Sequence, residues 1–483
     1  MRTSVSRLCI AALLAVAILA GPLSVGGASA GRDKQAPTAP AGLTSSSVTQ
    51  TSVALTWTAS TDNVAVASYS IYKNGTLVGT STTNAYTATA LIPGTQYSFY
   101  VKAKDPTGNS SAASNTCTVT TLPGTPPPAM PYRVVAYYTS WSAYRGYTPD
   151  KIPYDKVSYV NYAFANIGSD LKIALGDATI DITNFAKLRD LKKFNPDLKV
   201  LISVGGWSWS GKFSDVALTD ASRTVFAQSC VAFIKQYGLD GVDLDWEYPV
   251  AGGMSTNTTR PEDKQNFTLL LQKLRALLDA ENAGYVLTIA AGVTQSYVNN
   301  TEPAKILASV DFLNLMTYDI HGAWDRYTDF NGPLYPDSLS PQARWSIDDG
   351  VKLWVAAAGS SQGAAKSKLV VGIPFYGKAY GAVKSTDSSY PGLYGLYGKC
   401  TTVTYKEIVT GYLSNTAYTR YFHTTAKVPY LFNGATFVSY DDEESIAAKT
   451  AYIKAGALGG AMVWELSQDY EGRLIGAVYD RLK

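Results

Sequence analysis

The most constraining feature of the sequence is an alternation of apolar and amphipathic segments between residues 134 and 465. Eight apolar segments have the length and composition of buried strands: residues 134–138, 157–167, 199–204, 241–247, 286–291, 311–318, 369–375 and 459–465. Helical periodicity occurs between them, at residues 182–194, 222–237, 264–280, 340–357 and 443–455. This alternation predicts a parallel sheet covered on both faces, and eight units predict an α/β fold of the (β/α)8 TIM-barrel type. A doubly wound open sheet is the alternative, but no glycine-rich phosphate turn follows the first strand.

One connection between these strands is much longer than the others. More than 60 residues, rich in Tyr, Gly and Thr and containing turn signals, separate Tyr376 from Tyr440. A barrel connection of this length without structure of its own is uncommon. We therefore expect a small α+β insertion at about residues 377–439, between strands seven and eight, beside the top of the barrel.

The N-terminal segment has the features of a secretory signal. Arg2 and Arg7 precede an apolar run at residues 8–20, and the small residues Ala28, Ser29 and Ala30 follow it. This order predicts a signal peptide at residues 1–30 and a secreted, extracellular protein. No later run of about 20 apolar residues exists, so no membrane-spanning segment is expected.

Short strands with turn signals occupy the next segment, at residues 36–121. Asn74 and Gly75 form a tight hairpin signal, and Trp57 and Tyr97 occupy alternating apolar positions expected in the core. This pattern predicts an N-terminal all-β immunoglobulin-like sandwich, and the segment resembles a fibronectin type III module. Residues 122–131 are rich in proline and are expected to form a semi-rigid linker to a catalytic domain at residues 132–483.

Composition excludes several classes of function. The 483 residues carry a formal net charge of +3 at pH 7, too small to indicate binding to nucleic acid or membranes. There are two histidines and no Cys/His cluster with metal-ligand spacing, so we expect no metal or other cofactor. Three cysteines, Cys117, Cys230 and Cys400, follow the signal, and the sequence leaves open whether any of them pair. The 34 Tyr and 9 Trp suggest a sheet-rich fold or a ligand that stacks on aromatic rings, as carbohydrate does.

The segment from Asp240 to Pro249 concentrates acidic residues in an apolar context. In a β-strand, the period of two places Asp243, Asp245 and Glu247 on one face. Carboxylates about 7 Å apart repel one another in a partly dry site, so at least one should hold a proton at neutral pH. Such a group is prepared for general acid catalysis. A charged edge strand or a calcium loop is the alternative, but a calcium loop would place its ligands on a flexible turn rather than between apolar and aromatic residues.

Polar and aromatic residues close several of the eight strands. The carboxyl ends of the strands form the active site of a (β/α)8 barrel, so these side chains should converge. Together with the acidic segment they predict a sugar-binding cleft with acid chemistry at its floor. The residues expected around it are Tyr137, Phe164, Ser203, Gly206, Trp207, Glu247, Met316, Tyr318, Asp319 and Trp464.

Four motifs occur at the ends of predicted strands: Ser203-x-Gly205-Gly206, the Asp-x-x-Asp-x-Asp-x-Glu run ending at Glu247, Met316-Thr317-Tyr318-Asp319, and the Gly-Gly-Ala-Met-Val-Trp-Glu run that contains Trp464. These motifs resemble those of family 18 glycoside hydrolases, the chitinases. The likeness runs from Val134 to the C-terminus, and the inserted segment resembles the bacterial-type subgroup with deep clefts. It implies an enzyme that hydrolyses β-1,4 bonds between the N-acetylglucosamine units of chitin and needs no cofactor. A monomer is the default expectation for a secreted polymer hydrolase.

The resemblance also implies catalytic roles. Glu247 should protonate the glycosidic oxygen, and the family uses the substrate's own acetamido group as the nucleophile, through an oxazolinium ion. Asp245 should orient the acetamido N–H, and Asp243 should share its charge with Asp245 as a coupled pair. Tyr318 should donate a hydrogen bond to the acetamido oxygen and position it for attack.

The remaining positions are expected to hold or surround the substrate. Trp464 should form an apolar floor beneath the sugar whose bond breaks, because a flat indole matches the C–H groups of a sugar face. Trp207 and Trp324 match platforms on the reducing-end side, and Trp141 matches one toward the non-reducing end. Tyr137 and Ser203 are candidates to hold Asp243. The full substrate-binding set is Trp464, Asp319, Met316, Tyr137, Phe164, Ser203, Gly206, Trp207, Trp141 and Trp324.

Two other functions remain open from the sequence. Some relatives are endo-β-N-acetylglucosaminidases that cut the chitobiose core of N-glycans, although the Trp row and the insertion favour a long linear polymer. A chitin-binding lectin on the same barrel is a third possibility, but such relatives usually lack the acid, and Glu247 is present. The sequence does not distinguish endo from exo action or assign a role to the fibronectin-like segment.

Overall fold

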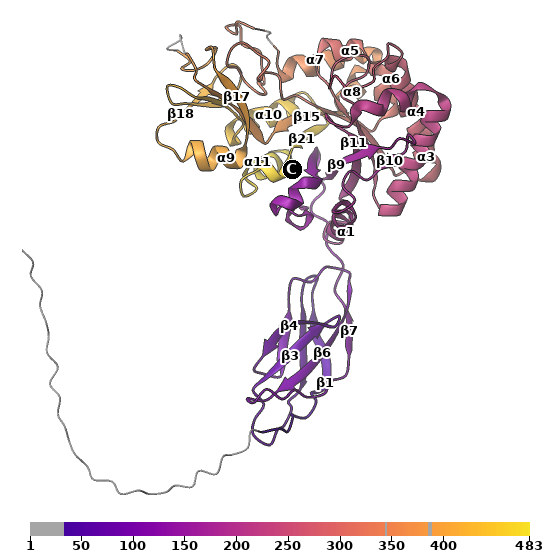
Figure 1. Cartoon of the computed structure of the whole chain (residues 1–483), viewed down its shortest axis with the longest axis vertical. Helices are drawn as coiled ribbons and strands as arrows, with labels where there is room; N and C mark the ends of the chain where they lie inside the picture. The colour runs from indigo at the N-terminus through magenta and orange to yellow at the C-terminus, as the bar shows by residue number, and fades with distance from the viewer. Residues whose placement is uncertain (1–32, 343–344, 385–388) are drawn as a thin grey trace, which may run out of the picture. The chain divides into compact units, whose positions relative to one another are not determined.

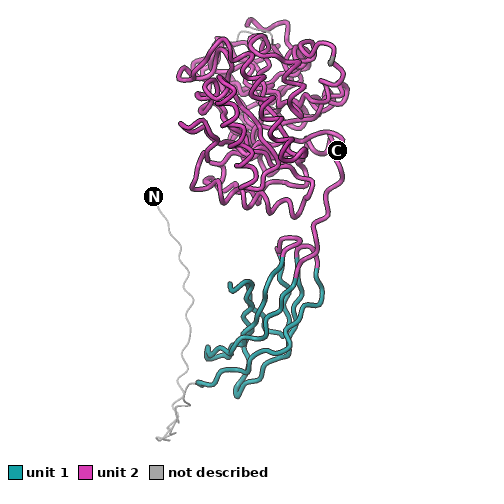
Figure 2. Tube along the Cα trace, turned by 90° about the vertical axis from the view of Figure 1, so that its right-hand side faces the viewer, with its two compact units in different colours: residues 1–48, 52–89, 96–119 teal, residues 49–51, 90–95, 120–483 magenta. Residues whose placement is uncertain are grey.

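The computed structural model describes residues 33–342, 345–384 and 389–483, so the predicted signal peptide at residues 1–30 lies outside the described residues. The chain divides into two compact units (Figure 2). Of the described residues, the first contains residues 33–48 together with Ser52–Thr89 and Gln96–Val119. The second contains Thr49–Thr51, Ala90–Thr95 and Thr120–Lys483.

The first unit is built from two β-sheets, which confirms the predicted all-β fold. One sheet has the order β1-β2-β5 and the other β4-β3-β6-β7. Trp57 and Tyr97 are core residues, with 3% and 7% of their surface exposed, and the Trp57 ring meets Tyr69 of the other sheet edge to face at 5.2 Å. The strands are β1 (Ala41–Val48), β2 (Val53–Thr58), β3 (Ser68–Lys73), β4 (Thr76–Ser81), β5 (Ala85–Ala88), β6 (Gln96–Lys104) and β7 (Cys117–Thr120).

Eight parallel strands of the second unit close into a barrel, as the sequence predicts (Figure 1). Closure is made by pairing of the first strand with the second and with the last, while β10 (Ile173–Ala174) adds an antiparallel edge to β9. In strand order the barrel consists of β8 (Arg133–Thr139), β9 (Tyr159–Ile167), β11 (Lys199–Gly205), β12 (Gly241–Asp245), β13 (Val286–Ala291), β14 (Phe312–Leu315), β15 (Leu369–Pro374) and β21 (Gly460–Trp464).

The helices follow the strands as expected, with one exception. The segment at 340–357 was expected to be helical throughout, but α7 begins only at Ile347. Ser340 instead donates its hydroxyl hydrogen to the Asp329 carboxylate at 2.9 Å, and Ser346 caps the helix by accepting from the Asp349 amide. The helices of the barrel unit are α1 (Asp181–Leu191), α2 (Phe213–Leu218), α3 (Asp220–Tyr237), α4 (Asp263–Glu281), α5 (Gln295–Asn299), α6 (Pro303–Ser309), α7 (Ile347–Ala357), α8 (Gln362–Lys366), α10 (Glu443–Ala455) and α11 (Arg473–Leu482).

The long connection between β15 and β21 forms a lobe with its own antiparallel sheet, which confirms the predicted α+β insertion. The strand order is β17-β16-β20-β19-β18, so the sheet is centred on the last strand before the chain returns to the barrel. A short helix, α9 (Tyr405–Glu407), continues into a π-helical turn at Ile408–Leu413. The strands are β16 (Tyr376–Gly381), β17 (Lys399–Thr404), β18 (Thr419–His423), β19 (Val428–Phe432) and β20 (Phe437–Ser439).

The described residues contain neither a disulfide nor a membrane-spanning helix. Cys117, Cys230 and Cys400 are all free thiols, and Cys230 is buried in α3. Among the described residues, no helix combines the length and apolar character needed to cross a bilayer.

A buried ion pair connects α10 to the segment that follows the lobe. Lys449 is fully buried, Asp441 is 2% exposed, and the ammonium lies 2.6 Å from Asp441 Oδ1. Burial lowers the pKa of Lys449, while the neighbouring carboxylate opposes that shift. Removing one partner of such a pair leaves an uncompensated buried charge, which costs more than the pair contributes.

We therefore expect Lys449→Met to lower the free energy of unfolding of the barrel unit by about 3–5 kcal/mol. Urea unfolding followed by tryptophan fluorescence measures this change. Lys454→Met, an exposed position on the same helix, is the control. The double variant Lys449→Met with Asp441→Asn should regain much of the loss; equal stability of Lys449→Met and wild type would contradict the prediction.

Candidate active site

The acidic row lies where β12 leaves the barrel. Asp243 and Asp245 are inside the strand, whereas Glu247 lies two residues beyond its end, so the strand is shorter than the predicted 241–247. All three side chains are buried, with Asp243 at 0%, Asp245 at 4% and Glu247 at 9% exposure. The increase in exposure from Asp243 to Glu247 makes Glu247 the outermost of the three carboxyl groups.

Asp243 is held by hydrogen bonds from four other barrel strands. Tyr137 and Ser203 donate to its Oδ2 at 2.8 and 2.7 Å. Thr288 and Asn314 donate to its Oδ1 at 2.6 and 3.3 Å. Burial raises the pKa of the Asp243 carboxyl, and the hydrogen bonds oppose that shift. Tyr137 and Ser203, the two residues proposed from sequence to hold Asp243, both contact it. Thr288 and Asn314 are two further donors to the same carboxylate.

Sequence reasoning missed Thr288 and Asn314. Each is the polar residue within an otherwise apolar strand, Val286–Ala291 and Phe312–Leu315, and each is 0% exposed. A buried polar side chain needs a hydrogen-bond partner, so a lone Thr or Asn in a core strand was the available signal.

Asp245 has a buried oxygen without a hydrogen-bond partner among the described residues. This atom is Oδ1. Burial raises the pKa of Asp245 well above its ordinary value, and the charges of Glu247 and Asp243 raise it further. An isolated buried carboxylate oxygen is unfavourable, so Asp245 is prepared to accept a hydrogen bond from a ligand or to carry a proton.

Glu247 has the protonation behaviour of an acid catalyst near neutral pH. Burial raises its pKa to about 7, a hydrogen bond from Tyr248 opposes the shift, and the charge of Asp319 adds to it. Its backbone is fixed by two side chains that sequence reasoning did not identify. The Glu247 amide donates to Ser210 Oγ at 2.9 Å, and its carbonyl accepts from Asn257 Nδ2 at 2.8 Å.

Tyr318 and Asp319 follow β14 and lie beside the acids. Burial raises the pKa of Tyr318 well above its ordinary value, and the charge of Asp245 is the next contribution. Its hydroxyl lies 3.8 Å from the sulfur of Met462. Asp319 has a left-handed backbone (φ 53°) and is paired with Lys378 at 2.6 Å. Met316 lies two residues before Tyr318 and is half-buried. Its backbone amide donates a hydrogen bond to the carbonyl of Ala291 at 2.9 Å.

Four of the expected aromatic residues form one connected group. Trp464 lies 5.3 Å from Tyr137 and 5.8 Å from Phe164, ring centre to ring centre. Phe164 continues to Trp141 at 6.4 Å. Gly206 permits this packing because it has φ of 74° and a Cβ there would lie 2.6 Å from the Phe164 ring.

The three expected indoles other than Trp464 differ in exposure. Trp141 is 39% exposed, Trp207 54% and Trp324 63%. Large exposed aromatic faces beside a polar site are typical of surfaces that bind a ligand. Trp324 also lies near the acids through Lys378, whose ammonium is 5.7 Å from the indole ring and is paired with Asp319.

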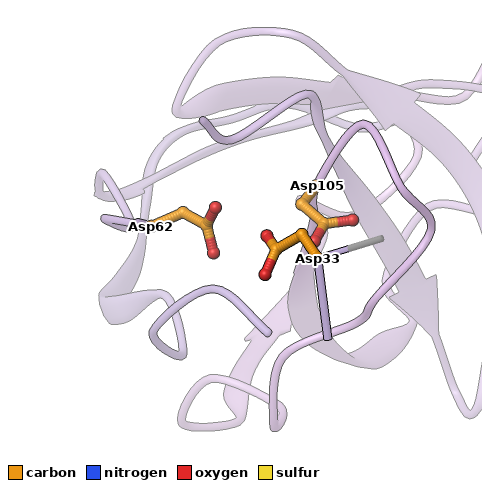
Figure 3. A group of neighbouring side chains, drawn as sticks. All are labelled: Asp33, Asp62 and Asp105. Carbon is orange, nitrogen blue, oxygen red and sulfur yellow. The ribbon is translucent and has the colours of Figure 1, made fainter. Parts of the chain in front are cut away.

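A second acidic group lies in the first unit. Asp33, Asp62 and Asp105 place carboxylate oxygens within 4.8 Å of one another (Figure 3). Each also organises a turn: Asp33 accepts from the Gln35 amide at 3.0 Å, Asp62 from Val64 at 2.9 Å and Asp105 from Gly108 at 2.7 Å. These hydrogen bonds use one oxygen of Asp33 and one of Asp62, whose other oxygens are buried without a hydrogen-bond partner among the described residues.

The fold and this site define a (β/α)8 protein with a buried carboxylate row at the carboxyl end of strand four. That arrangement is typical of a glycoside hydrolase. Residues 133–469 match the family described as Glycosyl hydrolases family 18, and residues 38–120 match the Fibronectin type III domain. The chain belongs to glycosyl hydrolase family 18.

Relatives and solved structures support this placement. Chitinase A1 of Niallia circulans is 43% identical over 412 residues, which is 72% of this chain and 58% of that protein. The chain thus matches less than two thirds of that relative's length. A family 18 N-acetylglucosaminidase from Paenibacillus barengoltzii aligns with a TM-score of 0.66 and 38% identity, over 73% of this chain and 100% of its own. An Ostrinia furnacalis chitinase domain in complex with (NAG)5 aligns with a TM-score of 0.65 and 28% identity, over 73% of this chain and 95% of its own.

The raised pKa of Glu247 has a consequence for stability. Between the ordinary value of 4.5 and about 7, the folded protein holds a proton that the unfolded chain releases, so rising pH disfavours folding across this interval. We expect Glu247→Gln to raise the melting temperature relative to wild type more at pH 8 than at pH 5. Thermal denaturation at the two pH values measures the difference, with the exposed Glu471→Gln as control. A difference independent of pH would contradict the raised pKa.

Proposed function

We propose that the protein is a secreted chitinase that hydrolyses β-1,4 bonds between N-acetylglucosamine units. The observation that carries the proposal is the buried row of Asp243, Asp245 and Glu247 with Tyr318 beside it. Membership of family 18 and the names of the chitinases it resembles support the same substrate.

The chemistry begins with proton transfer from Glu247. With a pKa of about 7, Glu247 is protonated in neutral or mildly acidic solution and can donate to the glycosidic oxygen as the bond to the anomeric carbon breaks. The carbonyl oxygen of the substrate's acetamido group attacks the anomeric carbon from the opposite face, forming a cyclic oxazolinium ion. Glu247, now ionised, takes a proton from the water that opens this ring, so configuration is retained.

Asp245 and Tyr318 orient the acetamido group for this attack. The unpartnered Oδ1 of Asp245 is suited to accept the acetamido N–H, which increases the nucleophilicity of the carbonyl oxygen and offsets the developing positive charge. The Tyr318 hydroxyl donates to that carbonyl oxygen and holds it in position. Asp243, held by four donors, shares a proton with Asp245 as the charge requirement changes along the reaction.

The aromatic residues supply the sugar-binding surface. Trp464, stacked near Phe164 and Tyr137, is the floor beneath the sugar at the cleaved bond. Trp141 extends this surface toward the non-reducing end, and Trp207 and Trp324 present exposed indoles on the reducing-end side. Asp319, Met316 and Gly206 complete the predicted set. Indole faces bind sugar rings with little loss of conformational entropy, so a row of them suits a linear polymer.

Three other functions are compatible with the same fold. Because the chain is similar to a protein named N-acetylglucosaminidase, release of single N-acetylglucosamine units is one alternative. Action on the chitobiose core of N-glycans uses the same acid and the same acetamido chemistry. A lectin role is disfavoured because Glu247, Asp245, Asp243 and Tyr318 are all present.

The arrangement of the chain suggests roles for its other parts. We propose that residues 1–30 direct secretion, that residues 36–121 act as a spacer module and that residues 122–131 link it to the catalytic domain at 132–483, with a monomer as the working form. The insertion at about 377–439 raises one side of the substrate-binding region.

We expect the purified protein to release chitobiose from chitin oligosaccharides and to leave a high-mannose glycoprotein intact. Chromatography of the products distinguishes the candidates, because an N-acetylglucosaminidase releases the monosaccharide and an N-glycan hydrolase releases free glycan. Absence of product from both substrates would refute an enzymatic role on N-acetylglucosamine bonds.

We expect Glu247→Gln to lower kcat on chitin oligosaccharides by about 10²-fold or more while binding is retained. The substitution removes the transferable proton and keeps the shape of the side chain. Steady-state kinetics measure the loss, and calorimetric titration with a hexameric oligosaccharide measures binding. Asp279→Asn, a substitution on the surface helix α4, is the control; a Glu247→Gln variant with wild-type kcat would remove Glu247 from the mechanism.

A further inference from the structure

The loop that carries Trp324 is attached to the inserted lobe by the side chain of Tyr397. The Tyr397 hydroxyl contacts backbone carbonyls on either side of Trp324 in the sequence. The Tyr397 hydroxyl lies 2.6 Å from the carbonyl oxygen of Asp325 and 3.3 Å from that of Gly322. These two carbonyls flank Trp324 in the chain. The single hydroxyl hydrogen of Tyr397 is shared between them, mainly with the Asp325 carbonyl just after Trp324 and more weakly with the Gly322 carbonyl two residues before it.

Backbone pairing extends this attachment along the loop. The Thr328 amide donates to the Gly395 carbonyl at 2.9 Å, and the Tyr394 amide donates to the Thr328 carbonyl at 3.1 Å. The Thr328 hydroxyl donates to the Gly392 carbonyl at 2.7 Å. The loop thus pairs with lobe residues that precede β17, and its position depends on the lobe.

Gly322 lies directly against the indole of Trp324. A Cβ on Gly322 would lie 2.5 Å from the ring, closer than side chains pack. The backbone at Gly322 is therefore the surface on which the indole rests. Because Tyr397 holds the Gly322 carbonyl, it holds the support of the ring as well.

Lys378 reaches the same indole from the first strand of the lobe. Its side chain is 9% exposed, and its ammonium lies 2.6 Å from Asp319 Oδ1 and 5.7 Å from the Trp324 ring centre. A buried ammonium beside an indole is attracted by the ring electrons. Two lobe residues, Tyr397 and Lys378, thus constrain Trp324 through different contacts.

We propose that Tyr397 is a positioning residue that fixes the plane of Trp324 for a sugar on the reducing-end side of the cleaved bond. Through this contact the lobe sets affinity on that side, while the barrel supplies the chemistry. The inference rests on the proposed function, because it assigns Trp324 to substrate binding. Among the described residues, the Tyr397 hydroxyl bonds only to carbonyls of this loop, whereas its ring packs edge-on against Tyr380 of the lobe. Loss of the hydroxyl alone should therefore act through Trp324.

The test compares Tyr397→Phe, Trp324→Ala and the double variant on a hexameric N-acetylglucosamine oligosaccharide. Loss of the hydroxyl should raise KM about fivefold, the factor expected for one lost hydrogen bond, with kcat changed less than twofold. In the Trp324→Ala background the same substitution should have no further effect on KM. A general loss of structure would lower activity equally in both backgrounds, so only a positioning role gives this pattern.

Lys378→Met supplies a second variant, which also removes the charge that balances Asp319. It should raise KM in the wild-type background and by a smaller factor beside Trp324→Ala, because only the part that acts through the indole is lost there. Tyr421→Phe is the matched control, because this Tyr lies on β18 of the same lobe and stacks on Tyr430. The inference is overturned if Tyr397→Phe leaves KM unchanged, or if its effect is the same with and without Trp324. A wild-type protein without turnover would instead refute the proposed function, so the two failures are distinguishable.

Discussion

Burial of three carboxyl groups in one row is the constraint on which the site depends. Three ionised carboxylates cannot be accommodated together in a dry site, so the row must hold protons or find partners. Asp243 finds partners, with four donors. Asp245 keeps a buried oxygen without one, and Glu247, the outermost, has a pKa of about 7. The three groups thus differ in function because their surroundings differ.

Closure of the barrel makes these surroundings possible. The donors to Asp243 come from β8, β11, β13 and β14, and a closed barrel brings all four strands around β12. Parallel register places Ser203 and Thr288 level with Asp243 on the two neighbouring strands. Asn314 and Tyr137 reach it from strands farther around the barrel. A doubly wound open sheet encloses no interior, so donors from four strands could not surround one carboxylate as they do here.

The lobe adds a second layer of organisation. The loop after β14 pairs with the lobe segment that precedes β17, through Thr328 and Gly395. The same loop begins at Asp319, whose charge contributes to the raised pKa of Glu247 and is balanced by Lys378 of the lobe. The insertion is therefore connected to the acid both through backbone and through charge. The exposed indole of Trp324 and the acid Glu247 come from different parts of the chain. Both are influenced by the Asp319–Lys378 pair.

Local patterns in the sequence determined much of this protein. The eight apolar strands, the long connection before β21, and the shared face of Asp243 and Asp245 were predicted because periodicity and side-chain type act within a few residues. The family resemblance named Tyr137 and Ser203 as partners of Asp243, and both contact it. Only the tertiary structure decided that Thr288 and Asn314 complete the set, that α7 begins at Ile347, and that Tyr397 and Lys378 hold Trp324. Such contacts join residues 71 or 72 apart, as Asn314 and Asp243 or Tyr397 and Asp325 are, and depend on strand register and chain folding, which no local pattern specifies.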